Sequence, residues 1–450
     1  MSELYLIGIM LSILIFIVPF FSMRTGLMMY LIVAFVFPSL WFGEITLRLE
    51  LLYCIELVFL FFIRAIVSEF IFRWNAVLSK YWVFLITICL STLFSLISNS
   101  KAYESSIFSL LIAFYGFFRP FLIMFLFMNF PTDVRLTRFV LQVPVWASIP
   151  IAVLSIGQSL GIPFAQKLTL LGYISPWRTP VLRMQEELGM IIRSTGVFES
   201  PVYNAVYFLL VLIVAGWLLI QGKLTLPRRL FLYLAVGLSF VGGITTLSAT
   251  FLVGVTVLMG LFVLLLRPKH LQRLLCIGTM NLFMVSLFAA FLIPYIIQHN
   301  LFFGTLHYQV QRILSGSVLE SRYDLQRGIL ASTYQAIKQR PVLGWGLIQA
   351  EENVFVGDSL YVVLLYVGGI IGLSLFLWLV WSILKYASQH RRADESSSGV
   401  YQIVFLTTLL LLIVGIGSPA FFLPRLKEWY WALVGLSLNR VTRCVQDTLT

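Results

Sequence analysis

Arginine is the residue type with the clearest chemistry in the two longest polar stretches of the chain, residues 161–200 and 298–357. A guanidinium group is planar, binds two phosphate oxygens at once and stays charged at any physiological pH. Two such groups from distant parts of the chain would suit a diphosphate, and we assign that role to Arg193 and Arg322. The other candidate binding residues in these stretches are Arg178, Arg183 and Arg327.

A carboxylate that could accept a proton from an attacking hydroxyl lies at the end of the second stretch. Asp358 stands where this stretch meets an apolar segment, and partial desolvation raises the pKa of a carboxylate toward the range of a general base. Asp is equally favoured as a helix N-cap, so we keep both roles, which one residue can combine. His299 and His307 are second choices for the base.

Several of these residues also have a plainer structural interpretation. Arg193 could anchor a loop to the start of a membrane span. The segment from Arg322 to Lys338 has apolar residues at four-residue spacing, which predicts an amphipathic helix whose arginines could face lipid head groups. Trp345 could stack on a sugar ring, although Trp also gathers at membrane interfaces.

The elements that must position these residues are membrane spans. The chain has 450 residues, of which 60% are hydrophobic and 11% charged, and its mean hydropathy is +0.96. These values exclude a water-soluble globular protein. Apolar segments long enough to cross a bilayer recur along the chain, and the second of them covers residues 26–43. The sequence therefore predicts an all-α, polytopic transmembrane helical bundle of about 12–13 spans with two long extracytoplasmic loops.

We expect the regions of the chain to alternate between spans and long loops. Transmembrane helices occupy residues 1–160, 201–297 and 358–450, the last with a cytoplasmic tail. The long loops are residues 161–200 and 298–357, and the second loop carries the amphipathic helix.

The distribution of basic residues predicts the orientation of the bundle. The net charge is +12, and basic residues beside a span resist translocation across the membrane. Lys and Arg gather in alternate connections, for example in those that contain Arg135 and Arg138 or Arg228 and Arg229. Both long loops then lie outside the cytoplasm. We expect this positive charge to meet membrane lipids, and we expect no nucleic acid partner.

No metal ion or other cofactor is expected. The four cysteines form no CxxC pair and no cluster with His, which argues against a zinc site or a disulfide framework. The closest acidic pairs in the long loops, Glu186–Glu187 and Glu351–Glu352, are adjacent residues that would point to different faces of a helix or strand. Neither pair suits a divalent cation.

Charged residues inside the predicted spans must pair or face a wet cavity. Glu56, Arg64 and Glu69 lie in the third span, and Arg119 lies in the fifth. Arg64 and Arg119 could line a polar groove for the substrate. We favour the alternative, a structural set of ion pairs such as Arg119 with Glu69.

Two groups of residues resemble motifs of one known family. The run from Arg193 to Asn204 (RSTGVFESPVYN) resembles the Arg-x-x-Gly-x-Phe, Pro and Asn pattern that begins a span in the O-antigen ligase and polymerase superfamily. Ser321-Arg322, the Pro-x-x-Gly-x-Gly turn from Pro341 to Gly346, and the run from Asp358 to Tyr361 before a Gly-rich span are similar to the long external loop of that family.

This resemblance implies a metal-independent glycosyltransferase of the bacterial cytoplasmic (inner) membrane, with its active site on the periplasmic or external side. The donor would be a polyprenyl-diphosphate-linked oligosaccharide, and the acceptor a growing glycan or a lipid. Arg193, Arg322 and Asp358 would be catalytic, and Tyr361 and Trp345 would bind substrate. A flippase and a chain-length regulator are the implied protein partners.

Family members either polymerise repeat units into a surface polysaccharide or ligate a finished glycan to a lipid or protein acceptor. Gly357 stands where the ligase pattern has a His, and Gln326 where many members have a Trp. Both departures favour a polymerase over a ligase.

A transporter or flippase of lipid-linked sugars is the alternative from a different class. Transporters often have two halves of similar hydropathy with broken helices. This sequence has no internal repeat that we can detect, and its polar residues concentrate in two unequal loops. An enzyme is therefore the better interpretation.

Overall fold

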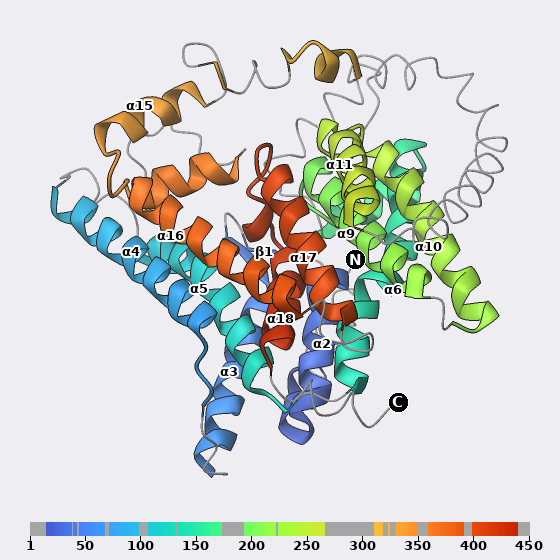
Figure 1. Ribbon diagram of the computed structural model, residues 1–450, viewed down its shortest axis with the longest axis horizontal. Coiled ribbons are helices and arrows are strands. Elements are labelled where there is room, and N and C mark those ends of the chain that lie inside the picture. The colour runs from blue at the N-terminus through green and yellow to red at the C-terminus, as the bar shows by residue number, and fades with distance from the viewer. Residues whose placement is uncertain are drawn as a thin grey trace.

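A computed structural model of the protein describes residues 15–37, 39–42, 45–67, 72–98, 107–131, 134–172, 193–221, 224–265, 310–317, 323–324, 330–348, 359–390 and 398–439. These residues form a helical bundle with one short antiparallel hairpin, in which β1 (Ser39–Phe42) pairs with β2 (Ile45–Arg48) (Figure 1). The predicted all-α bundle is confirmed.

Six of the described helices are long and apolar enough to cross a membrane. They are α4 (Ala76–Ser98), α5 (Ile107–Asn129), α6 (Val134–Ser159), α9 (Pro201–Gln221), α10 (Leu226–Thr245) and α16 (Leu360–His390). Shorter apolar helices accompany them, namely α2 (Met23–Val36), α11 (Ala249–Leu265) and α17 (Ser398–Val414). The chain is a multi-pass membrane protein.

Further elements are α3 (Leu49–Val67), α7 (Pro163–Gly172), α15 (Ala331–Gln339), the 3₁₀ turn η3 (Ala420–Phe422) and α18 (Leu426–Leu438). The α15 helix forms the C-terminal part of the amphipathic helix that the sequence predicts from Arg322 to Lys338.

The predicted span over residues 26–43 is wrong in its second half. The α2 helix ends at Val36, and Phe37 already has extended backbone angles. A residue that precedes proline is disfavoured in the α region, and the next residue in the sequence is Pro38. The apolar residues after it belong to the hairpin.

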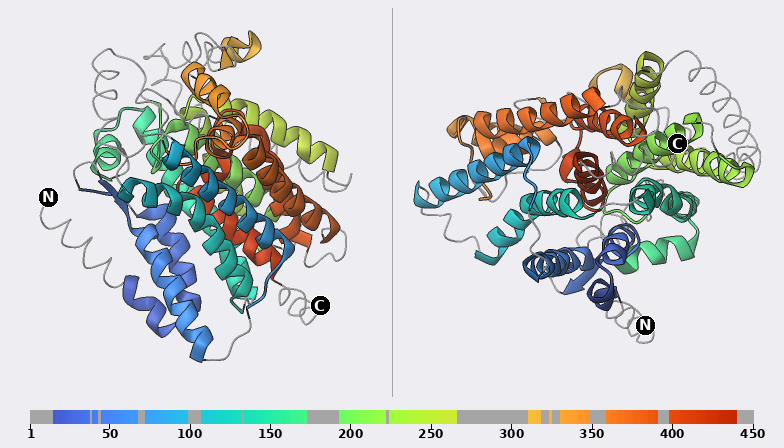
Figure 2. Two further views of the ribbon diagram at one scale, coloured as in Figure 1. Left: turned by 90° about the vertical axis from the view of Figure 1, so that its left-hand side faces the viewer. Right: turned by 60° about the horizontal axis from the view of Figure 1, so that its bottom comes forward.

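The α18 helix is the centre of the bundle. Every residue from Leu426 to Leu438 is buried, and α18 contacts α2, α5, α6 and α17, so that it is enclosed when the bundle is viewed from below (Figure 2). A Cβ on Gly435 would lie 2.5 Å from the Met124 carbonyl oxygen of α5, which shows how closely the two backbones approach. This position holds the polar first turn of α18 inside the protein.

Hydrogen bonds join the connections at one end of the bundle. The Arg73 amide donates to Asn129 Oδ1 at 2.6 Å, and Asn439 Nδ2 donates to the Phe130 carbonyl at 2.8 Å. The chain before α4, the end of α5 and the end of α18 therefore lie together.

Candidate functional site

The turn that carries Arg193 is fastened to the junction between α10 and α11. Arg193 is half-buried, and its Nε donates to the Thr246 carbonyl at 3.1 Å. The Ser194 amide donates to the Thr245 carbonyl at 3.2 Å, and the two hydroxyls of the same residues lie 3.0 Å apart. The hydrogen bonds between this turn and the α10–α11 junction therefore fix the orientation of the Arg193 side chain.

Gln158, near the end of α6, holds the next residues of this turn from inside the bundle. Its side-chain oxygen accepts hydrogen bonds from the Thr195 and Gly196 amides at 3.0 and 2.9 Å. Its Nε2 donates to the Gly196 carbonyl at 3.2 Å. Our reading of the sequence missed Gln158; the available signal was a polar residue near the end of an otherwise apolar segment.

Gly196 and the side chain of Asn204 pack against each other. Gly196 has φ +59°, a conformation that L side chains rarely adopt, and a Cβ there would lie 2.8 Å from Asn204 Oδ1. The Asn204 Nδ2 in turn donates to Ser155 Oγ at 2.9 Å. The Gly and Asn of the run from Arg193 to Asn204 are thus required by the fold of this turn.

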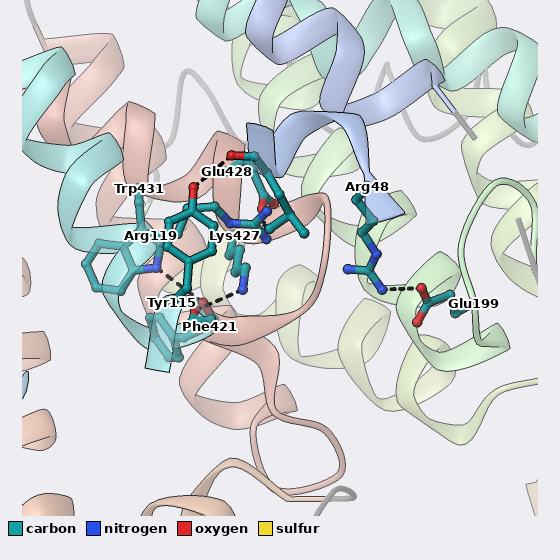
Figure 3. A network of polar contacts seen from close by, with 10 residues as sticks. Arg48, Tyr115, Arg119, Glu199, Phe421, Lys427, Glu428 and Trp431 are labelled. Atoms are coloured by element: carbon teal, nitrogen blue, oxygen red, sulfur yellow. Dashed lines mark hydrogen bonds and ion pairs between the residues drawn. The ribbon is translucent and has the colours of Figure 1, made fainter. Parts of the chain in front are cut away.

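An ion pair links this turn to the hairpin. Arg48, the last residue of β2, pairs with Glu199, two residues before α9 begins (Figure 3). Residues that are 151 positions apart in the sequence therefore meet at the start of α3 and α9.

The second motif region, Pro341 to Gly346, packs into a break in α16. Gly369 has φ +60° and ψ −160°, which interrupts the helix. The Tyr366 and Val367 carbonyls accept from the Trp345 and Gly346 amides at 2.7 and 3.0 Å, and the Ile370 amide donates to the Pro341 carbonyl at 2.9 Å. A helix can break within a membrane only where other groups satisfy its backbone, and this turn supplies those groups.

Trp345 lies between this turn and α15. It is 6% exposed, and its Nε1 donates to the Ala336 carbonyl at 2.8 Å. The Arg340 guanidinium lies 4.1 Å from the centre of the indole and donates to Ser95 and Ser98 of α4 at 2.6 Å each. Burial lowers the pKa of Arg340, but a guanidinium starts from so high a pKa that it stays charged. These contacts hold the turn in place; the contact of Trp345 with a sugar stays a prediction.

Tyr361 fixes the first turn of α16. Its hydroxyl donates to the Leu412 carbonyl of α17 at 2.7 Å, and the Leu360 amide donates to the Gly415 carbonyl at 2.8 Å. The chain that follows Asp358 is therefore held against the end of α17. Contact of Tyr361 with substrate stays a prediction.

The remaining predicted site residues lie outside the described ranges. They are Arg178, Arg183, His299, His307, Arg322, Arg327 and Asp358. The convergence of Arg193 with Arg322 and the role of Asp358 therefore stay predictions.

The charged residues inside the bundle that the structure describes make structural contacts with the protein itself. Arg119 of α5 pairs with Glu428 of α18 (Figure 3), which is a structural ion pair of the kind that we favour from the sequence; Glu69, the example of a partner given there, lies outside the described residues. Arg64 donates to the Pro19 and Phe20 carbonyls at 3.1 and 2.9 Å. Its guanidinium is thus directed to the chain before α2, and a groove that it would share with Arg119 stays a prediction.

Further charges surround the Arg119–Glu428 pair. Lys427 Nζ donates to the Gly116 carbonyl of α5 at 3.0 Å. Lys427 is also within electrostatic range of Glu50 and of Arg48. A run of charged residues thus extends from the turn with Glu199, through the start of α3, to the first turn of α18.

Comparisons with known proteins gave no match. No model of a known protein family matches the chain, and no curated protein matches its sequence. Within the described ranges, no three His, Cys, Asp or Glu side chains lie close enough together to hold a metal ion.

Proposed function

We propose that the protein is a membrane glycosyltransferase that polymerises polyprenyl-diphosphate-linked oligosaccharide repeat units into a surface polysaccharide, at the outer face of the bacterial cytoplasmic membrane. The support is the order of the two motif regions along the chain and the multi-pass bundle that carries them. The single observation that carries the proposal is the fixed position of Arg193, whose Nε is bound to the Thr246 carbonyl in a turn held by Gln158.

A fixed cation is what the proposed reaction needs. The bond between the anomeric carbon and the diphosphate oxygen breaks, and negative charge develops on the leaving diphosphate. Cations that are already oriented toward those oxygens lower the barrier, because they do not reorganise during the reaction. We assign this role to Arg193 and Arg322, with Arg178, Arg183 and Arg327 as further contacts to the donor.

The acceptor hydroxyl forms the new glycosidic bond. Its oxygen attacks the anomeric carbon, and Asp358 takes its proton as the general base. The products are a lengthened glycan on the acceptor and a free polyprenyl diphosphate. Tyr361 and Trp345 are the proposed sugar contacts, and the proposed chemistry uses no metal ion.

Elongation by the purified protein tests the proposal. The protein in lipid nanodiscs receives a polyprenyl-diphosphate oligosaccharide, and the products are separated by size, with and without a metal chelator. We expect a ladder of longer glycans in both samples. Arg193→Ala should abolish the ladder, while Arg229→Ala, an exposed arginine at the start of α10, should leave it unchanged. A wild-type protein that forms no ladder, or only without chelator, would contradict the proposal.

A further inference from the structure

One face of α16 combines aromatic and basic side chains at the surface of the bundle. Trp381, Ser382 and Lys385 follow Trp378 by three, four and seven residues, a spacing that places all four on one face of a helix. We call them the α16 stripe. Trp378 and Trp381 are 48% and 64% exposed, and Lys385 is exposed as well. Because Trp favours the level of the lipid head groups, the α16 stripe is a lipid-facing surface with a positive charge at one end.

A second lysine reaches this stripe from the neighbouring helix. The α4 helix packs beside α16 (Figure 1), and Lys80 of α4 donates a hydrogen bond from its Nζ to Ser382 Oγ. The Lys80 ammonium also lies 4.3 Å from the centre of the Trp378 ring. Ser382 donates its own proton to the Trp378 carbonyl at 2.8 Å, so its oxygen is left to accept from Lys80. Lys80 is thus held on the stripe, and an ammonium has three N–H donors, so that others remain for a ligand.

The two lysines bring like charges together without a counter-charge. Lys80 lies within electrostatic range of Lys385, and no carboxylate in the part of the chain that the structure describes forms an ion pair with either of them. Two ammonium groups in this arrangement repel each other, and a negatively charged group between them would replace that repulsion with attraction. A phosphate oxyanion fits, because it accepts charge-assisted hydrogen bonds from more than one donor.

The position of Lys80 along α4 matches the level of lipid phosphates. At the other end of α4, Arg340 donates hydrogen bonds to Ser95 and Ser98. Lys80 and Ser98 are about 27 Å apart along the helix at a rise of about 1.5 Å per residue, which is close to the ~30 Å thickness of the hydrocarbon core of a bilayer. Lys80 and Arg340 therefore mark the two edges of that core, and Lys80 lies at the depth of the phosphates of one leaflet.

We propose that the α16 stripe and Lys80 bind an anionic phospholipid. The lipid phosphate lies between the ammonium groups of Lys80 and Lys385, and the acyl chains continue past Trp381 and Trp378, which are further from the end of α16. Basic side chains between transmembrane helices recognise acidic lipids in this way. A zwitterionic lipid fits less well, because the cation of its head group would add a third positive charge beside the two lysines.

Native mass spectrometry of the whole protein in detergent tests this site, because it counts the lipids that stay bound. Phosphatidylglycerol is titrated into the wild type, Lys80→Met, Lys385→Met and the double variant of these two positions. Met keeps an unbranched side chain and removes the charge. The matched control is Lys167→Met combined with Lys338→Met, which removes two exposed lysines from α7 and α15 and changes the net charge by the same amount.

We expect each single variant to weaken the binding of the first phosphatidylglycerol by about fivefold, and the Lys80 and Lys385 double variant by about 25-fold, because one lysine beside an acidic lipid contributes about a factor of five. The control double variant should bind like the wild type. Lys385 is exposed, so Lys385→Met does not threaten folding, and wild-type affinity in that variant would overturn the inference.

Two further ligands establish which chemical group is recognised. Phosphatidylcholine carries a phosphate but no net charge, and we expect it to bind more weakly than phosphatidylglycerol and equally in the wild type and the double variant. Inorganic phosphate at the same concentration should not displace the bound lipid. Equal binding of the two lipids by the wild type, or displacement by inorganic phosphate, would contradict an acidic-lipid site. Neither titration involves glycan transfer, so the result is independent of the proposed function.

Discussion

The side-chain amide of Gln158 binds both sides of Gly196: its oxygen accepts from the Gly196 amide at 2.9 Å, and its Nε2 donates to the Gly196 carbonyl at 3.2 Å. A residue of α6 thus fixes the turn that presents Arg193, although 38 positions separate the two partners.

Gln158→Leu should reduce elongation by about 100-fold, because a shift of about 1 Å in a catalytic group has an effect of that size. The variant should also lower the free energy of unfolding by about 1–3 kcal/mol, since buried backbone groups lose their partner. Glycan ladders and thermal unfolding measure the two effects. Gln335→Leu, at an exposed position of α15, is the control, and equal activity in both variants would contradict this role.

Gly196→Ala should abolish elongation, because the added Cβ would lie 2.8 Å from Asn204 Oδ1. Gly161→Ala is the matched control. Gly161 also has positive φ, +70°, but no atom lies within 4 Å of a Cβ there. Backbone strain is then common to both variants, and only Gly196→Ala displaces Asn204. If the two variants lose the same activity and stability, the packing of Asn204 against Gly196 is unimportant.

Gly369→Ala should destabilise the protein by about 3 kcal/mol, through strain at positive φ together with overpacking. A Cβ at Gly369 would overlap the Val342 carbonyl, whereas one at the neighbouring Gly368 meets no atom within 4 Å. Gly368→Ala should therefore be close to neutral. Unfolding temperatures in the same detergent compare the two, and a neutral Gly369→Ala would show that the Pro341–Gly346 turn does not depend on this break.

Arg119→Gln alone should lower the free energy of unfolding by about 3–5 kcal/mol, because Glu428 would remain buried without its ion-pair partner. Adding Glu428→Gln should restore most of that loss. A double-mutant cycle on thermal unfolding measures the coupling between the two residues. Additive effects would show that the ion pair contributes nothing to stability.

Hydropathy was sufficient to predict most helices of the bundle, since long apolar runs such as Pro201–Gln221 have few alternatives in a membrane protein. It failed after Val36, because the residues from Ser39 to Phe42 form the first strand of a hairpin. It also gave no indication that α18 is the central helix, because the apolar sequence Leu426–Leu438 looks the same whether lipid or protein surrounds it.

The partners of buried polar residues could not be predicted in the same way. Arg119 was expected to need a counter-charge, but its partner Glu428 lies 309 residues further along the chain, and only the tertiary packing of α5 against α18 brings them together. Gln158 belongs to no motif. The Gly residues of the Pro341–Gly346 turn were noticed from the sequence, but the break at Gly369 that receives the turn was not.

The central claim is that Arg193 and Arg322 act together on one donor diphosphate, and a double-mutant cycle on the elongation rate tests it most directly. Rates are measured for the wild type, Arg193→Ala, Arg322→Ala and the double variant, each confirmed as folded. We expect each single variant to lose about 100-fold or more, and the double variant to lose little beyond that, because groups that act as a unit are not additive. Single variants that retain most of the wild-type rate, or losses that multiply in the double variant, would contradict the claim.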